Sequence, residues 1–431
     1  MTAAVRAVAA LGVVGVLALA GCTREPVAVQ RSLPSTTAGT VLSVGLNDGG
    51  QLGRPAPTGM QTSFAPVTGA GGRGTLAGAA SVAAGGRHSL AVRSDGRVVA
   101  WGSGDHGQLG DGTRNDSRVP VFVRAPDHEP GQLHDAVAVG ADTDFSMALL
   151  GDGTVVTWGR GNTAQHGNGD PSADATSPVH VLDPTGSGPL RDVTQIAADG
   201  STELALLRDG TAVGWGDNFY GQLGPGVPHR VLLPVRIRGA DGAPLGSVTG
   251  IAIGGQHALA LLADGRVLAW GHNDRYQLGD GSRRDRAVPR PVRGPGGGGD
   301  LRDVVAVAAA EKHNAALRRD GTVVTWGNNT AGQLGAGTLR AVAQPVAVVG
   351  EQGPALLRSV RSVAVGEAYT VAVCADGDVL TWGANSRGQL GSGDRGGRAR
   401  PGPVDTAPGV PFPLHITAVG AGQRHLLLLT R

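Results

Sequence analysis

The sequence WGSGDHGQLG, which begins at Trp101, decides the fold because the chain carries seven versions of it. The other copies are VGLNDGGQLG from Val44, WGRGNTAQHG from Trp158, WGDNFYGQLG from Trp215, WGHNDRYQLG from Trp270, WGNNTAGQLG from Trp326 and WGANSRGQLG from Trp382. Successive copies start 55 to 57 residues apart. A fixed period of about this length is typical of propellers and arrays, in which no unit buries its apolar face alone.

Each repeat contains the signals of four strands. An Asp-Gly pair such as Asp95-Gly96 lies between two apolar runs, which predicts a hairpin with a two-residue type I′ turn. A Val- and Ala-rich run such as SVAAGG from Ser81 precedes the hairpin, and a Pro-Val pair such as that at Pro120 follows the loop after it. Because proline cannot donate to a sheet ladder, the Pro-Val strand is expected at the outer edge. Four antiparallel strands in seven units predict an all-β, seven-bladed β-propeller.

The two ends of the chain complement each other. The last unit, ITAVGAGQRHLLLLTR, stops where its Asp-Gly turn should come, and the first unit begins with the strand TVLSVG at Thr40. We therefore expect residues 40–45 to complete the blade that contains residues 416–430. A shared blade removes an open sheet edge that would invite aggregation.

The repeated motifs resemble those of a known family. The combination of G-x-x-H, a hairpin with Asp-Gly, W-G-x-N and G-Q-L-G-x-G is similar to the repeat of the regulator of chromosome condensation family, from about Thr40 to the C-terminus. The resemblance implies the seven-bladed propeller. It implies less about function, because one scaffold hosts unrelated binding activities.

The N-terminus has the features of an export signal. Arg6 precedes an apolar stretch over residues 7–20, which is short for a transmembrane helix and typical of a signal peptide core. The stretch ends in Leu-Ala-Gly-Cys at Cys22, which resembles the lipoprotein cleavage box and implies acylation of Cys22 with chains such as palmitate. An ordinary secretory signal with a chance cysteine is the alternative, and both interpretations export the protein.

The chain then divides into three parts. We expect a lipoprotein signal peptide over residues 1–21, a tether over residues 22–39 that is rich in Pro, Ser and Thr, and the propeller over residues 40–431. The second cysteine, Cys374, occupies a position that holds Leu or Arg in other repeats, so it is interpreted as a strand filler. The predicted location is the extracytoplasmic side of the cell membrane.

The motifs for catalysis and cofactor binding do not stand in the structural context that those functions need. Gly102, Gly104 and Gly107 match G-x-G-x-x-G, but the chain continues into a loop where a pyrophosphate site needs a helix. Four histidines share one repeat position (His88, His257, His313 and His425), which suggests a packing site with a backbone hydrogen bond rather than a metal site. The six repeat tryptophans are expected between blades. We predict no catalytic residue, no metal and no cofactor.

Residues that depart from the repeat are the candidates for function. The loops after Q-L-G are arginine-rich in three repeats, and as candidate partner-binding residues we name Arg114, Arg118, Arg283, Arg284, Arg286, Arg395, Arg398 and Arg400. One hypothesis is a discontinuous basic patch that meets an anionic surface. The alternative is a set of solvated loops, partly compensated by neighbouring aspartates. The formal net charge of +2 gives no bulk argument for nucleic acid binding.

Two classes of function follow. The first, which we favour, is a non-enzymatic, membrane-anchored module that binds an envelope or extracellular protein through loops on a propeller face, as a monomer. Because the family includes a secreted bacterial inhibitor of β-lactamase, the resemblance implies enzyme inhibition as one form of this class. The alternative is guanine-nucleotide exchange, the activity of the eukaryotic family member, although export would separate the protein from a cytosolic GTPase. A deep axial pocket with converging carboxylates would instead favour an enzyme.

Overall fold

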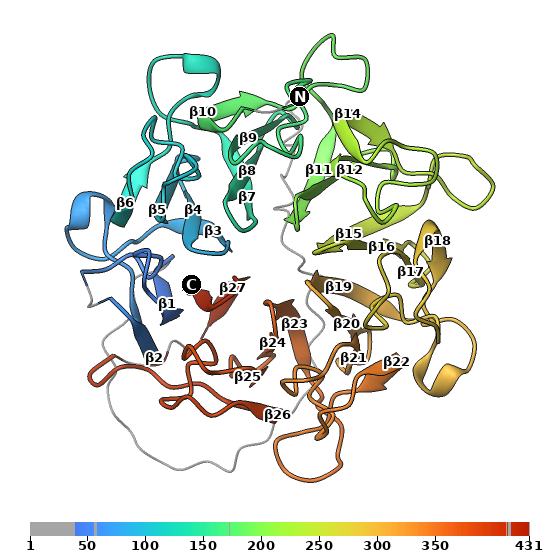
Figure 1. Ribbon diagram of the computed structural model, residues 1–431. Coiled ribbons are helices and arrows are strands. Elements are labelled where there is room, and N and C mark those ends of the chain that lie inside the picture. The colour runs from blue at the N-terminus through green and yellow to red at the C-terminus, as the bar shows by residue number, and fades with distance from the viewer. Residues whose placement is uncertain (1–38, 56–57, 172, 411, 413–414, 431) are drawn as a thin grey trace, which may run out of the picture.

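The computed structural model describes residues 39–55, 58–171, 173–410, 412 and 415–430. These residues form seven four-stranded antiparallel sheets, arranged as blades around a central axis (Figure 1). The predicted seven-bladed β-propeller is therefore confirmed. Within the described ranges, no helix is long and apolar enough to span a bilayer. Short 3₁₀ turns lie between blades at η1 (Ala70–Gly72), η2 (Pro126–His128) and η3 (Pro295–Gly297).

The strands of each blade run in order from the axis outward. The innermost strands are β3 (Ala79–Ala84), β7 (Ala136–Ala141), β11 (Val193–Asp199), β15 (Val248–Gly254), β19 (Val304–Ala310), β23 (Val360–Val365) and β27 (Ile416–Ala421). The second strands are β4 (His88–Arg93), β8 (Phe145–Leu150), β12 (Thr202–Leu207), β16 (His257–Leu262), β20 (His313–Arg318), β24 (Tyr369–Cys374) and β28 (His425–Thr430).

The outer half of each blade follows the same pattern. The third strands are β5 (Val98–Gly102), β9 (Val155–Gly159), β13 (Ala212–Asp217), β17 (Val267–Gly271), β21 (Val323–Gly327), β25 (Val379–Gly383) and β1 (Val41–Leu46). The outermost are β6 (Ser117–Phe122), β10 (Ala175–His180), β14 (Arg230–Arg236), β18 (Arg286–Pro291), β22 (Val342–Ala347), β26 (Arg398–Pro403) and β2 (Met60–Pro66). The Pro-Val strands are thus the edge strands, as predicted. We number the blades 1 to 6 from β3–β6 to β23–β26, and blade 7 contains β27, β28, β1 and β2.

Blade 7 joins the two ends of the chain. Strand β1 pairs antiparallel with β28, so that Val41 lies opposite Leu429 and Gly45 lies opposite His425. The predicted shared blade is confirmed. Closure in this way gives both β1 and β28 a ladder on each side.

Alternating strand directions divide the connections between two ends of the ring. The turns from the first to the second strand and the long Q-L-G loops share one end, which we call the loop face. There the backbone N–H of Ser103 donates to the carbonyl of Arg87 at 2.8 Å. The Asp-Gly turns and the links to the next blade share the other end, the hairpin face, where Gly151 donates to the carbonyl of Asp135 at 2.8 Å.

The hairpin turns differ from the predicted type. The aspartates of these turns keep negative φ, whereas Gly96 has φ of 77° and donates to the carbonyl of Arg93 at 2.9 Å. This is a three-residue loop, a type I turn closed by a left-handed glycine. The prediction of a type I′ turn was wrong because the aspartate has another role: Oδ1 of Asp95 accepts from the N–H of Arg97 at 3.1 Å.

Two sets of buried side chains join neighbouring blades. All six tryptophans are fully buried, and each indole N–H donates to the carbonyl of a Q-L-G glutamine in the preceding blade, as Trp101 does to Gln51 at 2.9 Å. The four repeat histidines are also buried, and Nε2 of each lies within 3.1 Å of Ser146, Asn314, Thr370 or Ser89 in the following blade. These partners are side chains, where we expected backbone groups.

Candidate functional site

The predicted arginines lie in the Q-L-G loops or on the outer strands that leave those loops. They belong to blades 1, 4 and 6, which are not neighbours in the ring. Arg398 is turned inward and donates to the carbonyls of Thr381, Gly402 and Pro403. Burial lowers the pKa of its guanidinium. Arg398 therefore stabilises its own blade.

The other arginines are divided between internal contacts and solvent. Arg114 pairs with Asp174 at 3.2 Å and Arg286 with Asp280 at 3.3 Å. Arg283 lies over the ring of Tyr276, with 4.4 Å from its guanidinium carbon to the ring centroid. The remaining members are Arg118, whose stem lies beside Gly50, Arg400, which donates to the carbonyl of Gly353, and the exposed Arg284 and Arg395. A role for these arginines in partner binding stays a prediction.

Carboxylates from four blades surround the axis on the loop face. Asp142, Asp199, Glu311 and Glu367 line a cavity of about 90 Å³ at this mouth. Oδ2 of Asp199 accepts from the N–H groups of Gly255 and Glu311 at 2.9 and 3.2 Å, so one carboxylate ties three blades together. Oδ2 of Asp142 accepts from the N–H of Ser201 at 3.0 Å. We call these four residues the acidic mouth.

Burial and crowding shift the proton affinity of the acidic mouth. Burial, followed by the charge of Asp142, raises the pKa of Asp199 to about 8. Burial and the neighbouring Glu367 raise the pKa of Glu311. A carboxylate in such surroundings gains a proton more readily because its charged form is poorly solvated and repelled. With a pKa of about 8, Asp199 is mostly protonated at neutral pH, so the mouth carries less negative charge than its four carboxyl groups alone would give it.

An aromatic surface lies on the same face of the propeller as the acidic mouth. The Q-L-G loop of blade 3 presents Phe219 with 62% of its surface exposed. Its ring centroid lies 5.3 Å from that of His229 and 5.0 Å from that of Tyr220. Tyr220 in turn lies 3.9 Å from His272 of blade 4. These four rings, which we call the aromatic ladder, cross the boundary between blades 3 and 4.

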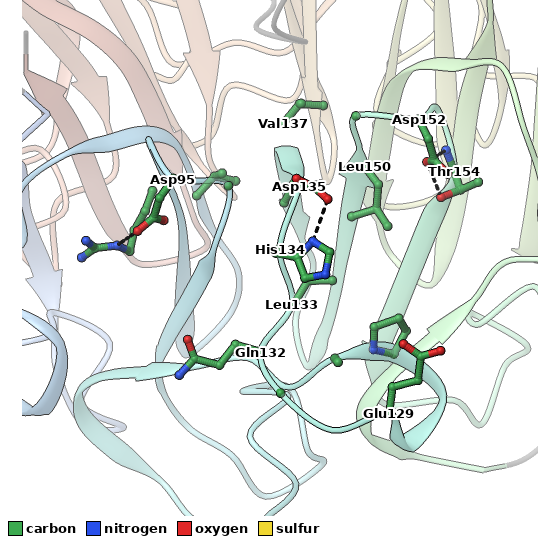
Figure 2. A pocket seen from close by; sticks show the side chains of 18 of the residues that line it. Asp95, Glu129, Gln132, Leu133, His134, Asp135, Val137, Leu150, Asp152 and Thr154 are labelled. Atoms are coloured by element: carbon green, nitrogen blue, oxygen red, sulfur yellow. Dashed lines mark hydrogen bonds and ion pairs between the residues drawn. The ribbon is translucent and has the colours of Figure 1, made fainter.

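The hairpin face holds a larger cavity between blades 1 and 2 (Figure 2). Its volume is about 1000 Å³, and its walls include Leu133 and Leu150. Figure 2 shows Asp95 and Asp152 on opposite sides, with the Asp135–His134 pair between them. Asp95 pairs with arginines and Asp152 accepts from Thr154, so the carboxylates here are engaged by neighbouring groups. The cavity is broad and open to solvent.

The sequence motifs for cofactors have structural explanations. Gly102, Gly104 and Gly107 lie at the end of β5 and in the following loop, with no helix after them.

Glu203 is fully buried inside blade 3, and burial raises the pKa of its carboxyl well above the usual value. Cys374 is buried in β24, opposite Val360, and packs in the core. Cys22 lies outside the described residues.

Sequence reasoning missed the aromatic ladder and most of the acidic mouth. A signal for Phe219 was present, because its repeat position holds Asp105, Asn162, Asp274, Thr330 and Ser386 in other blades. The mouth did have a signal in the linear sequence. Asp142 and Asp199 lie three residues before the repeat position held by the buried histidines, and Glu311 and Glu367 lie two residues before it, so all four carboxylates are at or within the turn between the first and second strands.

Comparison with known proteins identifies the family. The model of the RCC1-like domain matches residues 27–348, and models of the regulator of chromosome condensation (RCC1) repeat match residues 360–389 and 376–429. The chain is 32% identical to the ultraviolet-B receptor UVR8 of Arabidopsis thaliana over 351 residues, which is 81% of this chain and 74% of UVR8. It is 33% identical to human HERC2, an E3 ubiquitin-protein ligase, over 68% of this chain but only 6% of HERC2.

Solved structures agree on the fold. Prp20p of Saccharomyces cerevisiae superposes with a TM-score of 0.73 at 23% identity, covering 92% of each chain. Human WBSCR16 superposes with a TM-score of 0.72 at 23% identity, covering 91% of this chain and 99% of its own. Taken together with the repeats and the closed seven-bladed ring, these matches show that the chain belongs to the RCC1-like domain family.

Proposed function

We propose that this protein is an exported, lipid-anchored and non-enzymatic interaction module, whose loop face binds a protein of the cell envelope. The observation that carries the proposal is the exposure of Phe219 (62%) and of the neighbouring His229 at one end of the aromatic ladder, on a rigid loop face. Large exposed apolar groups on a soluble surface mark sites of protein interaction when they are grouped. Aromatic residues on loops held by a scaffold are typical of binding surfaces.

The loop face is rigid because its Q-L-G loops are internally bonded. In blade 3, Oδ1 of Asn218 accepts from the N–H of Leu223 at 2.7 Å, and Oε1 of Gln222 accepts from the N–H of Tyr220 at 3.0 Å. Equivalent asparagine and glutamine bonds hold the loops of blades 4, 5 and 6. Fixed loop stems with variable tips present different side chains without the entropic cost of ordering a mobile loop.

The fold is used for protein binding elsewhere in the family. The yeast structure of Prp20p is described together with its binding to Gsp1p and histones, and a second structure shows it bound to Kap60. These partners are not transferred to this chain. They support the coarser statement that a propeller of this kind serves as a protein-binding surface.

The size of the axial cavity supports binding rather than catalysis. Carboxylates do converge on the axis, but the cavity of about 90 Å³ is smaller than the roughly 300–1000 Å³ of pockets that hold small substrates. Guanine-nucleotide exchange stays the alternative that the family resemblance implies. Export would place the protein away from a cytosolic GTPase.

The path of the chain supports an orientation at the membrane. Gly39 lies on the hairpin face, where its N–H donates to the carbonyl of Thr430 and its carbonyl accepts from the N–H of Ala79. An anchor at Cys22 would reach this face through residues 23–38, a span of at most about 60 Å when extended. The anchor would then join the propeller at its hairpin face and leave the loop face free of the attachment.

In-cell cross-linking followed by affinity capture and mass spectrometry tests the proposal. The native protein is compared with a Cys22→Ala variant, which lacks the acylation site. We expect one envelope protein to be enriched with the native chain and lost when anchoring is lost. If that protein is an enzyme, its activity with and without the purified propeller tests for inhibition. Enrichment of nothing above background would contradict the proposed function.

A further inference from the structure

The cavity on the hairpin face has apolar surface that the repeat does not explain. Val137 and Leu150 of blade 2 line it and are only half-buried (Figure 2). Exposed Ala80 of blade 1 and exposed Pro130 also line it. Val137 is the bulged residue at the start of β7, and three other blades carry a threonine at that position, namely Thr194, Thr249 and Thr417. Blade 2 thus has an apolar lining where these blades are polar.

The charged groups around this cavity include both signs, and several are paired. Nη2 of Arg97 lies 2.7 Å from Oδ2 of Asp95, and Nε of Arg93 lies 3.3 Å from the same oxygen. Nδ1 of His134 lies 2.6 Å from Oδ2 of Asp135. Because both signs are present, the apolar lining rather than net charge selects an occupant of the cavity.

The described part of the chain begins beside this cavity. The carbonyl of Gly39 accepts from the N–H of Ala79 at 2.9 Å, and the next residue, Ala80, lines the cavity. The N–H of Ser94, another lining residue, donates to the carbonyl of Gly78 at 2.6 Å. The residues before Gly39 therefore leave the propeller at the edge of the cavity.

The sequence before Gly39 contains a short apolar segment. Residues 27–33 read VAVQRSL, and the two valines and the leucine are two and four residues apart, so they share one side of an extended chain. Residues 34–38 connect this segment to Gly39 and span at most about 18 Å when extended. The match to the RCC1-like domain model begins at residue 27, so the family resemblance includes the segment.

We propose that residues 27–33 of this chain dock in the cavity between blades 1 and 2, with their apolar side chains against Val137 and Leu150. A segment joined to its site by a short linker has an effective concentration in the millimolar range. Docking that is too weak between separate molecules is therefore occupied within one chain. The cavity of about 1000 Å³ is at the upper end of the roughly 300–1000 Å³ that holds a drug-sized ligand, which leaves room for three apolar side chains.

Docking sets how far the propeller stands from an anchor at Cys22. With residues 27–33 bound, only residues 23–26 are free, and they span at most about 14 Å in place of about 60 Å. The inference goes beyond the proposed function. It does not depend on acylation, because the segment belongs to the chain with or without a lipid.

Disulfide trapping in the full-length Cys22→Ala chain tests the docking. Ser32→Cys in the docked segment is combined with Gln132→Cys or with Gly151→Cys, which line the cavity from two different loops. A Cβ at Gly151 would lie 3.8 Å from Val137, so this position reports on the apolar lining. Two cysteines form a disulfide only when their Cα atoms come within about 7 Å.

Thr75→Cys gives the matched control pair. Thr75 precedes Leu76 as Gln132 precedes Leu133, and it is exposed at the boundary between blades 7 and 1, where the described chain begins. A free segment would reach Thr75 at least as often, because the closed loop is shorter. We expect the disulfide to Gln132→Cys or Gly151→Cys to form on the order of tenfold faster than that to Thr75→Cys.

Two changes before Gly39 test what holds the segment. The triple variant Val27→Ser, Val29→Ser, Leu33→Ser should lose the preference for the cavity, whereas Thr36→Ala should keep it. Circular dichroism of the reduced variants confirms that each is folded. An equal or faster disulfide to Thr75→Cys, no disulfide to either cavity position, or an unchanged preference in the triple variant overturns the inference. A disulfide between two chains would assign the cavity to a second copy and also overturns it.

Discussion

Ser89 and His425 lie 336 residues apart in the sequence, yet Oγ of Ser89 is 2.8 Å from Nε2 of His425 across the boundary between blades 7 and 1. Ser89 gives its own hydroxyl hydrogen to the carbonyl of Gln51 at 2.9 Å. Nε2 of His425 is therefore the nitrogen that carries the proton and donates. Three further pairs of neighbouring blades are joined in the same way. In each pair a histidine is hydrogen-bonded to a side chain of the next blade, and that side chain donates to a main-chain carbonyl.

Ser89→Ala tests how much the hydrogen bonds from His425 to Ser89 and from Ser89 to Gln51 stabilise the boundary between blades 7 and 1. The change leaves the buried N–H of His425 without an acceptor, so we expect a loss of about 1–3 kcal/mol in the free energy of unfolding. Ser94→Ala, in an exposed hairpin turn, is the control and should be neutral. Urea unfolding monitored by circular dichroism measures both. Equal stability of the two variants would show that these hydrogen bonds do not stabilise the boundary between blades 7 and 1.

The buried histidines should lower the free energy of unfolding of the protein in acid. Burial lowers the pKa to about 4 in His88, His166 and His257, and to about 3 in His313 and His425. The unfolded chain, with histidine pKa near 6.5, then binds more protons than the folded chain below that pH. Stability should fall from about pH 6.5 downward, by about 1.4 kcal/mol per pH unit for each histidine.

Unfolding measured at several pH values between 7.5 and 4.5 checks this slope. His425→Phe introduces phenylalanine, which blade 2 carries at the equivalent position as Phe145. It should reduce the fall in unfolding free energy with pH by the contribution of one histidine. Ser94→Ala changes no ionisable group and should leave the slope unchanged. A slope that is the same in all three proteins would show that the buried histidines do not govern acid unfolding.

The buried carboxyl of Glu203 should have the opposite effect and destabilise the protein as the pH rises. Neither of its buried carboxyl oxygens has a hydrogen-bond partner in the described structure, and burial raises its pKa. Its contribution to stability is present below about pH 4.5 and declines as the pH rises toward its folded pKa. Glu203→Gln should therefore stabilise the protein, and the gain should grow by about 1.4 kcal/mol per pH unit above pH 4.5.

Thermal unfolding at pH 5 and pH 8.5 measures this difference. The rise in midpoint for Glu203→Gln should be larger at pH 8.5. Glu129→Gln, on an exposed loop of the hairpin face, should show no difference at either pH. A stabilisation that does not change with pH would mean that Glu203 is not held protonated in the folded state.

Cys22→Ala tests the predicted anchor. Without the thiol no acyl chain can be attached, so the variant should lose palmitate labelling and move from the membrane fraction to the soluble exported fraction. Cys374→Ala is the control, because a buried strand residue in the propeller should not affect membrane attachment. Retention of the label and of membrane association in Cys22→Ala would contradict the lipoprotein interpretation.

The repeat made most of the fold predictable. Seven copies of the motif gave the number of blades, the Pro-Val pairs gave the edge strands, and the missing Asp-Gly turn after Thr430 gave the shared blade. The hairpin type was not predictable from the Asp-Gly pair alone. The same two residues fit either a type I′ turn or a type I turn with a left-handed glycine, and the Asp95 side chain decides between them.

The candidate site was less predictable, for a physical reason. The acidic mouth collects carboxylates at the axis from separate blades, and the aromatic ladder pairs Tyr220 with His272 across a blade boundary. Such contacts depend on the rotation between blades, which the repeat does not encode residue by residue. The arginine clusters were visible in sequence, but Arg398 is turned into its own blade and Arg283 over Tyr276.

Site-specific photo-cross-linking in cells tests the central claim, that the loop face binds a protein partner. A photoreactive residue is placed at Asn162 or Thr330, exposed loop tips of blades 2 and 5 on either side of the ladder-bearing blades, and at Glu129 or Asp241 on the hairpin face. The account predicts that one envelope protein is cross-linked from the two loop-face positions and not from the two hairpin-face positions. Cross-linking of that protein from the hairpin face alone, or equally from both faces, would contradict it.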